Sequence, residues 1–423
     1  MNLNVLIAHR IGKKAAGKGK LSKISNIIAS VSVGLSIAIM IIAIAVAAGF
    51  RSEIWEKASG FSGDITIQAP GVEITNHQFP IYPLSYTKEL SSLPFVESLQ
   101  KVSYRTGTIK TEDHIQGVLF KGIGSDYNLD FYQKHLIEGE LPDYTPKLDS
   151  TGRTLPPSNE IVISKRLAQM LGFKCGDKAT AYFIDEDITL RRFTICGIFD
   201  AQLDELDKAL VIADERHISR LNRWKEGEVS GYEIIVKEQF KNKTDKCLDA
   251  IDETIYKYST EDDPSIVPTT LDERYYILFD WLHLLDLNVV IILALMIAVA
   301  GFNMVSGLLI ILFERISQIG LFKALGMRTN DIIKIFLYRA ASIVLAGLIP
   351  GNLAAITFCI LEKHFKFISL DPTSYFVNHV PVKIDATTII TLNVMAFILI
   401  MLIMLIPCRM VSRISPSKSL KVE

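Results

Sequence analysis

The sequence predicts an α-helical membrane domain with four transmembrane helices and a large α+β extracytoplasmic domain of two subdomains inserted between helices 1 and 2. Three observations support this fold class. The mean hydropathy is +0.29, although 22% of the residues are charged. Four stretches contain no Asp, Glu, Lys or Arg, namely 24–50, 287–313, 340–361 and 386–408. The block between the first two alternates strand-like and helix-like segments.

Each uncharged stretch is longer than the ~20 residues that a helix needs to cross about 30 Å of hydrocarbon. One stretch of this kind could be a buried core helix of a soluble protein, but four indicate membrane spans. The first could also be read as a signal peptide, because Ala45, Val46 and Ala47 form a small-x-small pattern. Its uncharged run exceeds the 7–15 residues or so of a signal-peptide apolar region, so we expect a retained helix.

Basic residues near the helix ends predict the orientation. Residues 1–23 contain six Lys or Arg and no acid, and 314–339 contain five against two acids. The segment 362–385 is balanced, with three basic and three acidic residues. We therefore expect both termini and the loop between helices 2 and 3 in the cytoplasm. The stretch GKKAAGKGK has phosphate-loop spacing, but Gly19 replaces the required Ser or Thr, so 1–23 is predicted to be an amphipathic, basic anchor.

The block 51–280 is expected to be the extracytoplasmic domain. EIVISKRLAQMLG and ALVIADERHISRLN each run from a strand into a helix, and YEIIVKE followed by KTDKCLDAIDETIYKY repeats that order. VESLQKVSYRTGTIK reads as one long strand or a strand pair. Both ends of the block offer a strand and a helix, while about 108–230 resembles a strand-rich insertion with a Pro-rich surface loop at 141–160.

Composition excludes several function classes. The net charge of −1 argues against a nucleic-acid partner. The five cysteines show no metal-ligand spacing, and no metal site is expected. Cys175 and Cys196 could pair across a hairpin, but unpaired cysteines are favoured. The histidines of the block stand apart from any nucleophile motif, so we expect no catalytic residues.

The segments after the block are predicted as transmembrane helix 2 at 281–313, a cytoplasmic coupling loop or helix at 314–332 and transmembrane helix 3 at 333–361. An extracytoplasmic loop at 362–385, transmembrane helix 4 at 386–408 and a cytoplasmic tail at 409–423 follow. In the coupling loop, apolar residues recur at helical spacing, which predicts a short amphipathic helix on the cytoplasmic face of the membrane. It could merely seat the loop, or it could dock into a partner. The residues expected to make that contact are Glu314, Arg315, Ile316, Ile319, Gly320, Lys323, Ala324, Leu325 and Gly326.

ERISQIGLFKALGM resembles the coupling-helix segment of type VII ABC transporter permeases, the MacB/FtsX superfamily. The tail is similar to the ending of that family, with Pro416, Leu420 and Glu423 matching. FPIYP, FKGIGSDY and LDPTSYFVNHVPVKI look like lipoprotein-releasing (Lol-type) permeases, so the resemblance covers essentially the whole chain. One hairpin departs from it. The family member that recruits a periplasmic lipoprotein chaperone has a lengthened hook there, whereas the segment 183–193 is short.

The resemblance implies a non-catalytic permease in the inner membrane of a Gram-negative bacterium. It would work with two copies of a cytoplasmic ABC ATPase, which bind ATP and Mg²⁺, so this chain itself needs no cofactor. A second permease, either another copy or a paralogue, would complete the complex. The cargo would be lipoproteins, with membrane lipids and a periplasmic lipoprotein chaperone as further contacts. A MacB-like mechanotransmission permease and an FtsX-like scaffold that regulates a cell-wall hydrolase are the alternative functions.

A lipid-accepting cavity would need small or polar residues where helices 1 and 2 approach. Candidate cavity residues are Ser30, Gly34, Ser36, Gly301, Asn303 and Ser306. Small residues also favour ordinary close helix packing, which is the alternative reading of the same set.

Overall fold

The computed structural model describes residues 20–410, except 113, 149–153, 186 and 204–208. The expected N-terminal amphipathic segment up to residue 19 and the tail from 411, with Pro416, Leu420 and Glu423, lie outside the described residues. The chain forms two compact units. The helical unit comprises Met1–Ser52, Asp280–Leu370 and His379–Glu423, and the sheet unit comprises Glu53–Phe279 and Asp371–Asn378.

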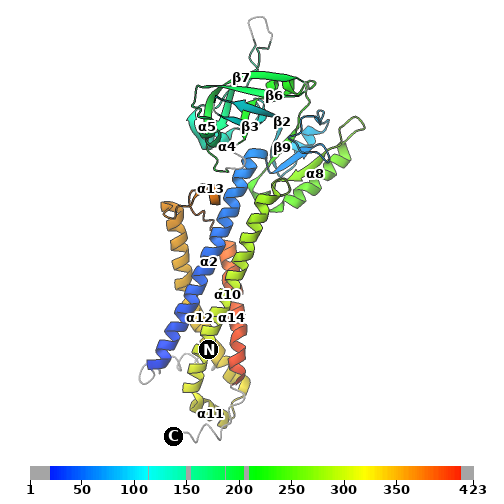
Figure 1. The fold of residues 1–423 in the computed structure, drawn as a ribbon. Helices are drawn as coiled ribbons and strands as arrows, with labels where there is room; N and C mark the ends of the chain where they lie inside the picture. The colour runs from blue at the N-terminus through cyan, green and yellow to red at the C-terminus, as the bar shows by residue number, and fades with distance from the viewer. Residues whose placement is uncertain (1–19, 113, 149–153, 186, 204–208, 411–423) are drawn as a thin grey trace. The chain divides into compact units, whose positions relative to one another are not determined.

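Among the described residues, four helices are long and apolar enough to cross a membrane, as the uncharged stretches predict: Ile24–Ser62, Tyr276–Glu314, Thr329–Phe365 and Ala386–Arg409. They belong to α2 (Lys20–Ser62), α10 (Tyr276–Glu314), α12 (Thr329–Phe365) and α14 (Ala386–Met410). In the helical unit these helices run alongside one another and share one apolar core, to which Val33, Met304, Val344 and Ile400 contribute (Figure 1). The protein is a membrane protein with an α+β domain between its first and second membrane helices.

The helices extend beyond the uncharged stretches. α2 runs twelve residues past residue 50 to Ser62, and α10 begins at Tyr276 rather than at 281. α12 begins at Thr329, inside the segment 314–332 that was predicted to be the coupling loop. Charged residues at these ends are compatible with helix but not with the hydrocarbon interior, so the uncharged run locates the membrane span and not the ends of the helix.

The described residues of the sheet unit form ten strands. They are β1 (Ile65–Gln68), β2 (Val96–Lys110), β3 (Ile115–Ile123), β4 (Leu136–Gly139), β5 (Glu160–Ser164), β6 (Lys178–Ile184), β7 (Ile188–Phe199), β8 (Leu210–Asp214), β9 (Gly231–Val236) and β10 (Val267–Thr270). The helices of the unit are α3 (Thr87–Ser91), α4 (Asp130–His135), α5 (Lys165–Leu171), α7 (Glu215–Leu221), the 3₁₀ helix η2 (Glu238–Lys243), α8 (Thr244–Tyr258), α9 (Leu271–Arg274) and α13 (Pro372–Tyr375).

Strand β2 belongs to both subdomains of the sheet unit. Its first half pairs with β9 from Val96 to Val102, and its second half pairs with β3 from Ser103 to Lys110. One long strand is therefore the correct reading of this segment. The strand-rich insertion, predicted to start at about residue 108, begins within β2 near Ser103.

The insertion is a closed barrel of six strands. β2 pairs with β3, β3 with β8, β8 with β5, β5 with β7, β7 with β6, and β6 returns to β2 through Thr108 and Ile109. Its interior is filled by aromatic and aliphatic side chains such as Phe120, Phe183 and Phe193, which contact one another. Closure satisfies the strand edges that an open sheet of this size would expose.

Strands β10, β1 and β9 continue from the first half of β2 as the flatter subdomain, in the order β10-β1-β9-β2, and β4 pairs with β7 at the barrel. Helices α3 and α8 supply Leu90, Cys247 and Ile251 to its core, which packs against Ile65 and Ile234 of the sheet. Figure 1 shows α8 beside β9.

Side-chain and glycine caps delimit two helices of the sheet unit. α5 starts after Ser164, whose hydroxyl accepts a hydrogen bond from the Leu167 amide, and ends at Gly172 in the left-handed conformation, with φ of 71°. α7 starts after Asp214, whose carboxylate accepts from the Arg216 amide. Strand–helix order is thus correct for β5–α5, β8–α7 and β9–α8.

Candidate functional site

The first candidate site is the connection between α10 and α12. It contains α11 (Ile316–Ala324), preceded by Arg315 and followed by Leu325. Gly326 has a φ of 83°, in the left-handed region that glycine favours. The Gly326 amide donates to the carbonyl of Lys323 at 3.0 Å, and the Met327 amide donates to that of Phe322 at 3.0 Å. This pair of bonds is a Schellman motif, and it gives α11 a fixed end before α12 begins.

α11 has one buried side and one exposed side. Ile319 is 1% exposed and packs into the core of the helical unit, and Gly320 is also buried. Leu321 is 50% and Leu325 76% exposed. Together these two side chains form an exposed apolar tip that a partner could cover.

The structure places the predicted contact residues in three groups. Glu314, Ala324, Leu325 and Gly326 are exposed; Arg315, Ile316 and Lys323 are half-buried; and Ile319 and Gly320 are buried. The buried pair supports α11 from inside, so the surface available for docking is smaller than the predicted set. Leu321 was missed by sequence reasoning, although it lies between two predicted positions.

Two of the candidate cavity residues, Gly34 and Gly301, lie at contacts between helices of this chain. A Cβ on Gly34 would lie 2.9 Å from the carbonyl oxygen of Gly347, and one on Gly301 would lie 2.7 Å from Ile403. Ser36 is 3% exposed. Ser30, Asn303 and Ser306 are half-buried, and the Ser306 hydroxyl donates to the carbonyl of Phe302 at 3.0 Å. For Gly34 and Gly301, close packing accounts for the absence of a side chain.

A buried ionic cluster in the sheet unit was not predicted. Lys121 of β3 is 0% exposed, and its Nζ donates to Glu233 Oε2 at 2.8 Å, Tyr127 Oη at 2.7 Å and the carbonyl of Phe61 at 2.5 Å. Tyr127 and Tyr104 both donate to the Glu233 carboxylate at 2.8 Å. The only signal in the sequence is a lysine inside the otherwise apolar run VLFKGIG.

The cluster holds the end of α2. Phe61 is the last residue but one of that helix, and its carbonyl lacks an intrahelical partner. An ammonium group at a helix C-terminus interacts favourably with the helix dipole. Burial lowers the pKa of Lys121 from 10.5 to about 8, although Glu233 acts in the opposite direction. Lys121 therefore stays protonated at neutral pH. Burial beside Glu233 also raises the pKa of the Tyr104 and Tyr127 hydroxyls well above 10, so both remain donors.

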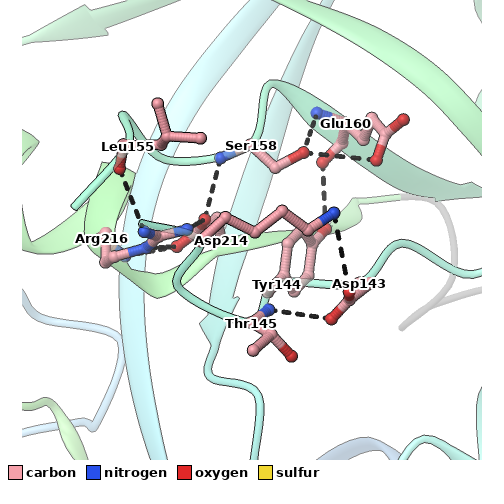
Figure 2. Close-up of polar contacts among 9 residues, drawn as sticks. Asp143, Tyr144, Thr145, Leu155, Ser158, Glu160, Asp214 and Arg216 are labelled. Carbon is pink, nitrogen blue, oxygen red and sulfur yellow. Dashed lines mark hydrogen bonds and ion pairs between the residues drawn. The ribbon is translucent and has the colours of Figure 1, made fainter. Parts of the chain in front are cut away.

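A second polar cluster anchors the segment 141–160 to the barrel (Figure 2). The Asp214 carboxylate is 1% exposed and accepts from the Ser158 amide at 2.9 Å and from Arg216 Nη2 at 2.6 Å. At the other end of the segment, the Tyr144 hydroxyl donates to the carbonyl of Glu160 at 3.0 Å. The described residues of this surface loop are therefore anchored to the barrel near both ends of the segment.

In the described part of the chain, the cysteines form no disulfide and the titratable groups form no metal-binding cluster. All five cysteines are described and free. Cys175 and Cys196 do not pair, and the Cys175 thiol donates to the Cys196 carbonyl at 3.1 Å. Among the described residues, no three His, Cys, Asp or Glu side chains are grouped so that they could hold a metal ion.

Part of this chain matches a known protein family. Residues 290–416 match the family FtsX-like permease C-terminal. The lipoprotein-releasing system transmembrane protein LolC of Xylella fastidiosa strain Temecula1 is 20% identical over 437 residues, which covers 100% of this chain and 99% of the relative. The protein of that name from Neisseria meningitidis serogroup B is 24% identical over 314 residues, covering 68% of this chain and 73% of the relative.

Solved structures resemble this chain distantly. The periplasmic region of MacB from Actinobacillus actinomycetemcomitans is 12% identical and covers 51% of this chain and 91% of its own, with a TM-score of 0.32. The extracellular domain of the noncanonic ABC-type transporter YknZ from Gram-positive bacteria is 12% identical and covers 49% of this chain and 99% of its own, with a TM-score of 0.30.

Proposed function

We propose that this chain, whose residues 290–416 match the C-terminal region of FtsX-like permeases, is the membrane subunit of an ABC transporter that releases lipoproteins from the membrane. FtsX-like permeases pair with ABC ATPases. Two relatives from different bacteria, similar over all or most of this chain, are both named as lipoprotein-releasing system proteins. That agreement supports the finer function.

The apolar tip of α11 is the observation that carries the proposal. Leu321 and Leu325 are exposed at the end of a helix that the Schellman motif and buried Ile319 hold in place. A rigid apolar protrusion suits insertion into a groove of another protein. In our proposal the separate ATPase binds this tip, and its closure on ATP moves α10 and α12, which flank α11 in sequence.

The proposed transport needs energy from ATP because acyl chains hold the lipoprotein cargo in the bilayer. Each buried CH₂ contributes about 0.8 kcal/mol, so a lipoprotein with several acyl chains leaves a bilayer extremely slowly on its own. A permease driven by ATP can lower that barrier only if a conformational change couples to the lipid. The second permease of the complex, which is another copy or a paralogue, would supply the opposite wall of the lipid path.

Depletion of this chain in its own bacterium tests the function. Lipoproteins that normally reach the outer membrane should accumulate in the inner membrane, as measured by fractionation and quantitative mass spectrometry. Integral outer-membrane proteins without a lipid anchor serve as the matched control at early times. Normal lipoprotein sorting after depletion would rule out the proposed cargo while leaving an ABC permease role intact.

A further inference from the structure

The sheet unit contains a pocket that no part of the proposed transport cycle uses. It has a cavity volume of about 150 Å³ and is lined by Leu203, Arg274, Tyr275, Tyr276, Ile277, Leu278 and Phe376. The lining is apolar and aromatic apart from one guanidinium, which is the pattern expected of a site for an amphiphile.

Strained backbone borders this pocket. Among the described residues, four that are not glycine have positive φ, and two of them are Phe376, at 59°, and Gln202, at 61°. Phe376 lines the pocket, and Gln202 precedes the lining residue Leu203. A non-glycine residue in this conformation is strained and persists where the surrounding structure enforces it, often at ligand sites.

A buried lysine is hydrogen-bonded to both of these residues with positive φ. Lys57 of α2 is 3% exposed, and its Nζ donates to Gln202 Oε1 at 3.0 Å and to the Phe376 carbonyl at 2.9 Å. These residues are 145 and 319 positions away in the sequence. One ammonium group therefore ties the lining residue Phe376, and the residue next to the lining residue Leu203, to α2, so part of the lining is held in place.

The guanidinium of Arg274 gives the pocket its charge. One Nη donates to Thr66 Oγ1 at 3.1 Å, and the side chain packs over the rings of Tyr104 and Tyr275. Burial alone would lower its pKa, but Tyr275, Tyr104 and Glu233 raise it above the ordinary value, so the group is always charged. A planar guanidinium beside apolar walls binds a phosphate more favourably than a neutral group.

The position of the pocket in the chain identifies the amphiphile. Tyr276, Ile277 and Leu278 form the first turn of α10, which is long and apolar enough to cross a membrane. Tyr276 and Ile277 are 62% and 67% exposed, which a soluble surface would rarely present together. We propose that this pocket binds one membrane phospholipid, with its phosphate at Arg274 and the upper part of an acyl chain against Leu203, Ile277 and Phe376.

The test uses the full-length chain in nanodiscs that contain phosphatidylethanolamine and a trace of photoactivatable phosphatidylglycerol. No ATPase and no cargo are needed, so the result is independent of the transport function. After illumination, mass spectrometry should find the label on peptides that contain 274–278. Arg274→Gln should lower that label about tenfold, the effect expected from losing a hydrogen-bonded charge pair, and Arg274→Lys should restore part of it.

A variant that fills the pocket without changing Arg274 tests the proposal even if the arginine variants misfold. Ile277→Trp replaces an exposed side chain and fills the pocket, so it should remove most of the label. Leu284→Trp is the matched control, because Leu284 is 60% exposed on the same helix and does not line the pocket. Equal labelling in Ile277→Trp and Leu284→Trp would overturn the proposal. So would equal competition by uncharged diacylglycerol, or selective displacement by a triacylated peptide, which would assign the pocket to cargo.

Discussion

Lys121 and Glu233 form an ion pair inside the sheet unit, with 2.8 Å between Nζ and Oε2 and exposed fractions of 0% and 1%. The pair joins β3 of the barrel to β9 of the flatter subdomain, across 112 positions of sequence. The same ammonium group binds the carbonyl of Phe61 at the end of α2. Three segments that are remote in the chain therefore depend on one side chain.

Removing one partner of this pair should destabilise the sheet unit strongly. Lys121→Met leaves the Glu233 carboxylate buried without its cation, which typically costs about 3–5 kcal/mol. The full-length variant in detergent should show a clear decrease in the midpoint of thermal unfolding, followed by intrinsic fluorescence.

The double variant separates charge from shape. Lys121→Met with Glu233→Gln removes both charges, so it should unfold at a higher temperature than Lys121→Met alone. If the double variant is the less stable protein, the hydrogen bonds of Lys121 matter more than the charge balance, and our account of the pair is wrong.

The sequence predicts the elements of this fold far better than their long-range partners. The uncharged stretches reveal four membrane helices, and Ser164 with Gly172 marks both ends of α5, because these signals act within one helix turn. The pairing of Thr108 with Tyr182, which closes the barrel, has no local signal. The position of Lys121 within an apolar strand shows that a partner is needed but does not identify Glu233.

The same limit applies to the candidate site. Helical spacing predicts both Gly320 of α11 and Leu325, the residue that caps it, as contact residues, yet the first is buried and the second is exposed. Hydrophobic periodicity predicts that a helix forms here, but it does not predict which side of the helix is buried. The buried side depends on the core of the helical unit, to which Ile319 contributes. The docking surface therefore needed the structure.

Acid should weaken the hydrogen bonds that the Asp263 carboxylate accepts in the loop after α8. Burial alone would raise the pKa of Asp263, but hydrogen bonds from the amides and hydroxyls of Ser85 and Thr260 outweigh it and lower the pKa from 3.8 to about 2. A carboxyl group with a lower pKa in the folded state stabilises the fold above about pH 4, and that contribution is lost as the pH falls toward 2.

Asp263→Asn should therefore destabilise the protein slightly at pH 7, by at most about 2 °C in the unfolding midpoint, because the group is near the surface. The difference from the unmodified protein should shrink at pH 2–3, where Asp263 itself becomes protonated. Asp262→Asn is the matched control for removing a charge from the same loop. A difference that grows as the pH falls would contradict the assignment of these hydrogen bonds to the ionised carboxylate.

The contact between α2 and α12 should not tolerate side chains at its glycines. A Cβ on Gly347 would lie 2.4 Å from the carbonyl oxygen of Ser30, and one on Gly351 would lie 2.4 Å from that of Gly34. Gly347→Val should therefore force the helices apart and cost about 1–3 kcal/mol, lowering the unfolding midpoint in detergent. Gly117→Val is the control, since nothing lies within 4 Å of a Cβ there. Equal midpoints for the two variants would mean that the helices are not packed this closely.

The last prediction concerns the tip of α11. Leu325→Asp places a charge on an exposed apolar position, so the chain should insert and fold normally while losing its ATPase partner. Leu321→Asp should act in the same way, because Leu321 is also exposed. We expect at least tenfold weaker co-purification of the ATPase, the loss typical of a central contact residue. Leu148→Asp is the matched control, since Leu148 is 65% exposed in the sheet unit.

Gly320→Asp should behave differently from both leucine variants. Gly320 is buried in the supporting side of α11, so a carboxylate there must be desolvated without a partner. We expect a lower unfolding midpoint for Gly320→Asp and unchanged midpoints for Leu321→Asp and Leu325→Asp. The two leucine variants place a charge on each of the two side chains that form the apolar tip. If both variants retained the ATPase fully, the partner would have to bind elsewhere.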